Sequence, residues 1–284
     1  RVLRDSALNI GLDPKYKLMT QAETIQFIRN NIFKFDLDYF RPLGNPTKFV
    51  AGMLQHFSRL QDEDITTKDY LLYADKLKKH KGKKPEESEK LEIQKTLELA
   101  NAFKVYEELK VKEGVMDFGD LIIKTLELFR RRSNILKAYR EQFKYVLVDE
   151  FQDTNYGQNE LAKLLTGKNG NITVVADDDQ AVYRWRGAAV SNVIQFRKSF
   201  PKTKIVVLTR NYRSTQEILD RSYDLIQFNN PDRLEGVEKI DKRLVSEVSP
   251  TSRKASRGDP ITFIHSDRVE NEAGAVAKKI KELV

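Results

Sequence analysis

The chain has 284 residues, and its 50 basic against 42 acidic residues give a formal net charge of +8. That balance fits a polyanionic partner such as nucleic acid, although many lysine-rich proteins are as basic, and the length suits about two domains. The absence of cysteine excludes disulfides, thiolate zinc sites and iron–sulfur clusters within these residues, and no apolar run approaches the ~20 residues of a membrane span.

The first half of the chain is predicted to be mostly helical. Apolar residues recur at intervals of three and four over residues 21–33, 91–114 and 118–131, and Gly114 stands where a helix stop is expected. Between the first two of these segments, Lys76–Lys90 is rich in lysine and almost free of apolar residues. We interpret it as an exposed loop whose charge could contact phosphates, with a solvated loop tip as the favoured alternative.

From residue 143 onward, short β-branched runs alternate with helical patterns, which predicts crossover units, a parallel sheet and hence an α/β fold. Strands are predicted at residues 145–148, 172–176, 204–208 and 261–266, and helices at residues 158–165, 191–200, 215–228 and 271–284. The first two strands are apolar throughout, as strands covered on both faces should be. The polar stretch 229–260 is interpreted as a long excursion with little core.

Two acids, Asp149 and Glu150, follow the first strand directly. In open parallel sheets, ligands bind beyond the carboxyl ends of the strands. Mg²⁺ is typically held by one or two carboxylates, and an adjacent carboxylate can orient an attacking water. A bare Asp-Glu pair is more often an acidic surface turn, so the residues after the next strands decide between the two interpretations.

The second strand is followed by "DDDQAVYRWRGA". Gln180 offers a neutral amide that could hydrogen-bond a phosphate or an attacking water. Tyr183 and Trp185 stand among arginines, the combination that stacking on unpaired bases requires. Taken alone, Trp185 is more often a core aromatic.

The third predicted strand is followed by "TRNYRS", in which Tyr212 stands between Arg210 and Arg213. An arginine brought from a neighbouring domain can stabilise charge on a transferring phosphoryl group, and a tyrosine can stack on a purine. The helix that follows carries a capping-box signature, Ser214 with Glu217. Either arginine taken singly is equally compatible with a solvated helix start.

The motifs "DEFQDTN", "DDDQAVYRWRGA" and "NYRS", in this order and spacing, resemble the superfamily 1 DNA helicases of the UvrD/Rep/PcrA type. The match covers residues 143–222, and "MDFGDL" (116–121) resembles a further family segment. The resemblance implies a RecA-like parallel sheet flanked by helices. Residues 1–20 and 113–200 would be part of a first RecA-like ATPase domain, residues 21–112 an inserted all-helical subdomain, and residues 201–284 the beginning of a second RecA-like domain.

For the ATP side of such an enzyme, the resemblance implies roles residue by residue. Asp149 would bind Mg²⁺, and Glu150 would be the catalytic base. Gln180 would sense the γ-phosphate. From the second domain, Arg213 would act as an arginine finger and Tyr212 would stack on adenine.

For the DNA side, the resemblance implies that Tyr183 and Trp185 stack on bases of single-stranded DNA, with Arg186 beside them. The implied activity is ATP-driven translocation on single-stranded DNA and duplex unwinding, with 3′→5′ polarity, in DNA repair or replication. The implied partners are single-stranded DNA, single/double-strand junctions, and repair or replication proteins, with no membrane. The absence of cysteine fits a reducing cytoplasm, and the resemblance implies a cytoplasmic, nucleoid-associated protein.

The sequence departs from the family pattern in three respects. The phosphate-cradling loop G-x-x-x-x-G-K-[ST] is absent, since "LTGKNG" (165–170) lacks the preceding glycine and the Ser/Thr. The late family motifs are also absent, and Ala176 stands where the family usually has glycine. We therefore expect these residues to be the middle of a longer helicase and to hydrolyse no ATP at a useful rate by themselves.

Two other interpretations remain open at the level of the sequence. One is a catalytically silent module that binds single-stranded DNA, which a phosphate-binding loop encoded upstream of Arg1 would exclude. The other is the helicase part of an AddA/RecB-like helicase–nuclease, which a nuclease domain in the full gene would favour.

Overall fold

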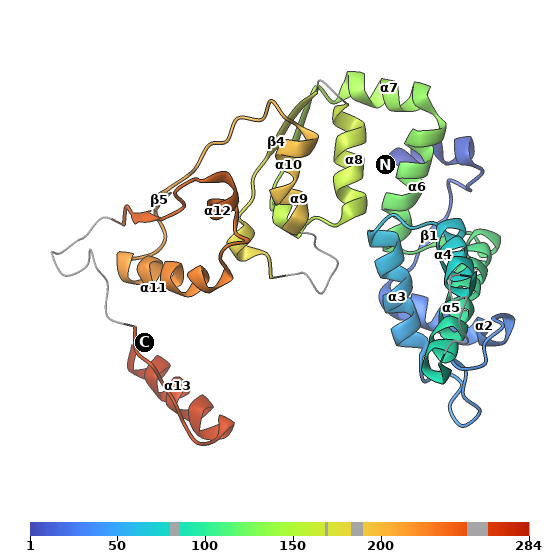
Figure 1. Cartoon of the computed structure of the whole chain (residues 1–284), viewed down its shortest axis with the longest axis horizontal. Helices are drawn as coiled ribbons and strands as arrows, with labels where there is room; N and C mark the ends of the chain where they lie inside the picture. The colour runs from blue at the N-terminus through green and yellow to red at the C-terminus, as the bar shows by residue number, and fades with distance from the viewer. Residues whose placement is uncertain (80–85, 168–169, 183–189, 249–260, 284) are drawn as a thin grey trace. The chain divides into compact units, whose positions relative to one another are not determined.

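The computed structural model describes residues 1–79, 86–167, 170–182, 190–248 and 261–283. The chain divides into two compact units, Arg1–Pro201 and Lys202–Val284 (Figure 1). Within the described ranges, no helix is both long enough and apolar enough to cross a membrane. Tyr183, Trp185 and Arg186 lie outside the described residues.

The first unit combines many helices with two pairs of short parallel strands. Its elements are α1 (Val2–Ser6), η1 (Ala7–Ile10), β1 (Lys17–Leu18), α2 (Gln21–Asn31), η2 (Ile32–Lys34), α3 (Val50–Asp62), α4 (Thr67–Lys79), α5 (Glu87–Glu113), β2 (Val115–Met116), α6 (Phe118–Arg131), α7 (Ser133–Gln142), β3 (Tyr145–Val148), η3 (Phe151–Asp153), α8 (Tyr156–Thr166), β4 (Asn171–Val174), η4 (Asp178–Gln180), α9 (Val190–Ile194) and α10 (Phe196–Ser199).

The helices predicted in the first half of the chain are confirmed. The segment predicted at residues 118–131 is α6, and the segment predicted at residues 91–114 is the longer α5, which ends at Gly114 with a φ of +63°. The loop predicted at Lys76–Lys90 is shorter than expected, because α4 continues to Lys79 and α5 begins at Glu87. A capping box between Glu86 and Glu89 starts α5 earlier than the apolar pattern indicated.

The helices α2 to α5 enclose the larger hydrophobic core of the described residues (Figure 1). Its most deeply buried members include Ile28, Phe35, Val50, Met53, Phe57, Ala74, Ala100, Phe103 and Tyr106. A buried carboxylate also orders the loop beside this core: Glu98 accepts hydrogen bonds from the backbone N–H groups of Asp38, Tyr39 and Phe40 at 2.9, 3.1 and 2.9 Å.

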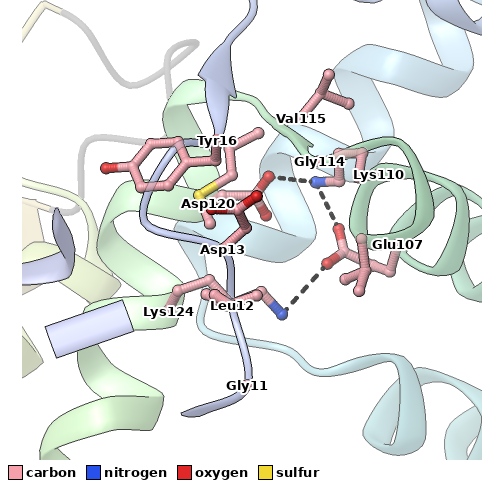
Figure 2. A pocket seen from close by; sticks show the side chains of 12 residues that line it. Gly11, Leu12, Asp13, Tyr16, Glu107, Lys110, Gly114, Val115, Asp120 and Lys124 are labelled. Atoms are coloured by element: carbon pink, nitrogen blue, oxygen red, sulfur yellow. Dashed lines mark hydrogen bonds and ion pairs between the residues drawn. The ribbon is translucent and has the colours of Figure 1, made fainter. Parts of the chain in front are cut away.

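A buried lysine joins the end of α5 to the start of α6 (Figure 2). Lys110, of which 2% is exposed, places its Nζ atom 2.7 Å from Glu107, 2.8 Å from Asp117 and 2.7 Å from Asp120. The hydroxyl of Tyr106 donates to Asp117 at 2.7 Å. Because a buried charge needs partners, this cluster holds the end of α5 against the start of α6 through one ammonium group.

The strands β3 and β4 pair in parallel, with Tyr145 opposite Asn171 and Val148 opposite Val174. The α/β class and the parallel pairing are therefore confirmed, whereas the larger RecA-like sheet stays a prediction, because each sheet in the described residues has two strands. The expectation that β3 is covered on both faces is wrong for these residues: Tyr145 is 72% exposed and Leu147 is 76% exposed. Helix α8 lies beside β3 and α6 (Figure 1), and it also contacts α3.

The second unit contains β5 (Arg210–Asn211), α11 (Gln216–Ile226), η6 (Gln227–Asn229), α12 (Leu234–Glu238), β6 (Val245–Ser246) and α13 (Val269–Leu283). The predictions of strands at residues 204–208 and 261–266 are wrong: these residues form neither a helix nor a strand and have no ladder partner among the described residues. An apolar run becomes a strand only where a neighbouring strand accepts its hydrogen bonds, and here β5 pairs with β6 instead.

The predicted capping box of α11 is also wrong. Thr215 is the N-cap residue, without a side-chain cap hydrogen bond. The backbone N–H of Ser214 donates instead to Asn211 Oδ1 at 2.7 Å, as does that of Arg213 at 2.9 Å. An asparagine that bonds the backbone two or three residues ahead forms a turn, and this turn ends the extended conformation before Ser214 could cap the helix.

Replacing Lys110 by methionine is expected to lower the free energy of unfolding of the 284-residue chain by about 3–5 kcal/mol, because the carboxylates of Asp117 and Asp120 lose their buried counter-ion. Urea unfolding followed by circular dichroism measures the change. Lys104→Met is the matched control on the same helix, since Lys104 is half exposed in its pair with Glu108 and should cost no more than about 0.5 kcal/mol. Equal losses in the two variants would contradict a central role for the buried cluster.

Candidate active site

The predicted acids of the first unit lie at the carboxyl end of β3, beside the end of β4. The ladder continues past both strands, because the N–H of Val175 donates to Val148 O and the N–H of Phe151 donates to Val175 O, each at 2.9 Å. Asp149 and Glu150 lie within this continuation, and Gln180 ends the short helix η4 that follows β4. The structure thus brings Asp149, Glu150 and Gln180 to one edge of the β3–β4 pair, while their chemical roles stay predictions.

A chain of hydrogen bonds connects Glu150 with Gln180. Gln152 donates from Nε2 to Glu150 Oε2 at 2.6 Å, and its Oε1 accepts the backbone N–H of Asp177 at 3.1 Å. Gln180 in turn donates from Nε2 to Asp177 Oδ2 at 2.7 Å. Two glutamine amides and one aspartate therefore join the turn after β3 to the turn after β4.

The backbone of Glu150 is left-handed, with φ +48°. A non-glycine residue in this region costs free energy on the order of 1–2 kcal/mol, and such residues concentrate at functional sites. The conformation turns the chain sharply after β3, so that Gln152 enters the interior while the side chain of Glu150 stays exposed.

The residues at this edge have the chemistry that a divalent cation requires. Asp149 is exposed, and one of its carboxylate oxygens accepts the backbone N–H of Glu150 at 3.0 Å. Asp177, Asp178 and Asp179 form a second acidic group, whose oxygens lie within 4.8 Å of one another. Carboxylate oxygens suit Mg²⁺, which needs only one or two of them and completes its shell with water and phosphate oxygens.

The chain downstream of residues 183–189 is also tied to the turn after β3. Asn192, a buried residue of α9, donates from Nδ2 to the carbonyl oxygens of Thr154 and Asn155 at 3.1 and 3.3 Å. The rings of Phe151 and Phe196 meet edge to face at 5.5 Å. Along the sequence, the predicted DNA-contacting residues Tyr183, Trp185 and Arg186 thus lie between the segment Asp177–Gln180 and helix α9. Both of these segments are hydrogen-bonded to the turn after β3.

Tyr212 and Arg213 belong to the second unit, where they directly follow β5. Both side chains are exposed, and 71% of Tyr212 is accessible. The turn that carries them is held by Asn211 and by Ser246, whose hydroxyl donates to Ser214 O at 2.7 Å. A turn held by hydrogen bonds, with two exposed side chains, is suited to contacting a ligand.

The pocket beside Lys110 does not coincide with the edge of the β3–β4 pair that carries Asp149 and Glu150 (Figure 2). Its volume of about 180 Å³ lies below the ~300 Å³ of typical ligand pockets, and two of the acids that line it, Glu107 and Asp120, are already paired with lysines. A larger pocket of about 680 Å³ lies among α2, α3 and the start of α6, and it too lacks the residues of the β3–β4 edge.

The connecting role of Gln152, Asp177 and Asn192 is not evident from the sequence. Gln152 was visible as one of the polar residues of "DEFQDTN", but nothing in the sequence distinguished it from an exposed amide. Its burial depends on the left-handed turn at Glu150 and on α9, which are features of the tertiary structure.

Asp62, at the end of α3, accepts a hydrogen bond from Asn155 Nδ2 at 2.6 Å, and Asn155 is the N-cap residue of α8. Burial raises the pKa of the Asp62 carboxyl to about 6. Below pH 4 both the folded and the unfolded chain hold this proton, whereas between about pH 4 and 6 the folded chain alone holds it. The contribution of Asp62 to stability is therefore lost as the pH rises through this window.

Asp62→Asn is expected to remove this loss, because a neutral amide still accepts from Asn155 and has no charge to bury. Urea unfolding at pH 4.5, 5.5, 6.5 and 7.5 measures the effect: the stability of the variant relative to the parent chain should rise with pH and level off above about pH 6. Glu92→Gln, at an exposed position of α5, is the control. A variant whose stability follows the same pH profile as the parent chain would contradict the prediction.

Two family models match the chain. The UvrD/REP helicase N-terminal domain matches residues 1–201, and the UvrD-like helicase C-terminal domain matches residues 206–284. The break between the two matches falls beside the division of the chain after Pro201.

Individual relatives are similar over nearly all of the chain. DNA helicase II of Haemophilus influenzae is 31% identical over 286 residues, which cover 100% of this chain and 34% of that protein. The ATP-dependent DNA helicases PcrA of Leuconostoc citreum and Bacillus subtilis are 31% and 30% identical, each over 100% of this chain and 33% of their own length. The chain thus spans about a third of the length of the relatives that it matches. With both units matched by helicase models and the acids and amides of "DEFQDTN" and "DDDQ" on one strand edge, the chain belongs to the UvrD/REP helicase family.

Proposed function

We propose that the chain supplies part of an ATP-dependent DNA helicase that moves along single-stranded DNA and separates duplex ahead of it. The observation that carries the proposal is the meeting of Asp149, Glu150 and Gln180 at one edge of the β3–β4 pair, within a single hydrogen-bonded network. Carboxylates and a neutral amide at the carboxyl ends of parallel strands are suited to a nucleotide, a divalent cation and an attacking water.

In this proposal Asp149 holds Mg²⁺, and Glu150 accepts a proton from the attacking water. Bound Mg²⁺ supplies charge neutralisation on the phosphate oxygens. Gln180 contacts the γ-phosphate through its amide. The exposure of Asp149 and Glu150 supports these roles, because both carboxylates are accessible to a ligand in solution.

The second unit contributes Arg213 to the γ-phosphate and Tyr212 to the adenine ring. Their exposure on a turn held by Asn211 supports this assignment. An arginine that arrives from another unit makes hydrolysis sensitive to the arrangement of the two units, and a motor requires such a dependence.

The DNA contacts are assigned to Tyr183, Trp185 and Arg186, which follow Gln180 closely in the sequence. The formal charge of +8 fits a nucleic-acid partner. We further propose that the full-length protein acts on single-stranded DNA and single/double-strand junctions with 3′→5′ polarity, in DNA repair or replication.

Glu150→Gln in the full-length protein is expected to lower kcat for DNA-stimulated ATP hydrolysis by about 10²–10⁴-fold, because the amide cannot accept the proton of the attacking water. A coupled ATPase assay with and without an oligo-dT strand measures the loss, and binding of a fluorescent ATP analogue should remain. Glu141→Gln, at an exposed position of α7, is the matched control and should leave kcat unchanged.

Turnover that survives in Glu150→Gln would contradict the role of Glu150. If the full-length parent protein binds oligo-dT but hydrolyses no ATP, the catalytically silent module is the correct function. The 284-residue chain, assayed in parallel, should show no turnover, because it contains no G-x-x-x-x-G-K-[ST] loop.

A further inference from the structure

Gln152 occupies a special place in the network at the strand ends. Only 1% of the residue is exposed, and it lies between the exposed carboxylate of Glu150 and the backbone of Asp177. A glutamine amide has one face that donates and one that accepts, and both are used here. The N–H of Asp177 requires the acceptor, so the NH₂ group must face Glu150, and the amide cannot flip without breaking both hydrogen bonds.

The surroundings of Gln152 hold it in place. The preceding residue, Phe151, is equally buried and packs edge to face against Phe196 of α10. Glu150 has a left-handed backbone and an exposed side chain, and an exposed glutamate without a fixed partner populates several rotamers. The 2.6 Å hydrogen bond from the buried Gln152 therefore restricts the exposed side chain of Glu150, which would otherwise populate several rotamers.

We propose that Gln152 is the positioning residue of Glu150 and that it couples the Glu150 carboxylate to the turn Asp177–Gln180. The proposal rests on the proposed function, in which Glu150 acts on the attacking water. Three successive hydrogen bonds connect the Glu150 carboxylate with the Gln180 amide: Glu150 to Gln152, Gln152 to Asp177, and Asp177 to Gln180. Any displacement of the Asp177 backbone changes the anchor of Gln152 and hence the direction of the carboxylate.

This coupling gives the segment after Gln180 a physical route to the catalytic carboxylate. Misplacement of a catalytic group by about 1 Å can cost roughly 10²-fold in rate, so a small movement of the turn is enough to switch hydrolysis. DNA bound downstream of Gln180 would act through Asp177 and Gln152. Stimulation of ATP hydrolysis by DNA therefore depends on the Gln152 amide, which itself need not touch either ligand.

The test uses the full-length protein with two substitutions at this position. Gln152→Met keeps the length of the side chain but removes both hydrogen bonds. Gln152→Glu keeps the acceptor for Asp177 but places a carboxylate against Glu150. Asn31→Leu is the control for the loss of a buried amide: Asn31 is buried in α2 and donates to Phe27 O at 2.9 Å.

We expect both Gln152 variants to lower the DNA-stimulated kcat at least tenfold, with KM for ATP and Kd for oligo-dT within twofold of the parent values. Asn31→Leu should lower Tm and leave kcat unchanged. A residue that only supports the fold would behave like Asn31, so an unchanged kcat in a folded Gln152→Met protein overturns the proposal. If Gln152→Met does not fold, Gln152→Glu decides in the same way.

A double variant tests whether Gln152 acts through Glu150. If it does, Glu150→Gln combined with Gln152→Met should be no slower than Glu150→Gln alone, because the group being positioned is already lost. A further tenfold loss in the double variant would overturn the positioning role and leave the proposed function intact. Failure of Glu150→Gln itself to slow hydrolysis would overturn both.

Discussion

The parallel, in-register pairing of β3 with β4 is the constraint on which the candidate site depends. Parallel strands end at the same edge, so residues that are far apart in sequence are brought together by the register alone. The ladder continues through Val175 and Phe151, which carries the two following turns alongside each other. A slip of one residue would turn the side chains after the strands to the opposite face and separate Glu150 from Asp177.

Buried polar groups then convert this proximity into defined geometry. Gln152 joins the two turns from inside, and Asn192 attaches α9 to the same turn. Lys110 does the same between α5 and α6, and Asp62 ties α3 to the N-cap of α8. Such groups are costly unless every partner is present, so each specifies one arrangement of its neighbours more sharply than apolar packing does. The helical region and the strand edge are thus held as one unit.

Much of the candidate site could be predicted from the sequence. The position of Asp149, Glu150 and Gln180 at one strand edge could be predicted, because acids and amides after apolar strand runs are conspicuous, while their roles stay predictions. Helix α6 could be predicted because its apolar spacing is regular. The strand predicted at residues 204–208 was wrong, because strand formation depends on a partner that periodicity does not reveal. The cap of α11 was wrong for a local reason: Asn211 accepts the backbone N–H of Ser214, which the side chain of Glu217 would accept in a capping box.

The sequence by itself determined the helices of the first half, the alternation of β3, α8 and β4, the acids and amides that follow these two strands, and the family resemblance, since these depend on residue type and spacing along the chain. The tertiary structure alone decided which polar residues become connectors. Burial of Gln152 follows from the left-handed turn at Glu150 and the packing of α9 and α10, and the charge cluster of Lys110 follows from the meeting of α5 and α6. These properties belong to pairs of elements, and an amide or a lysine has the same side chain whether it is solvated or enclosed.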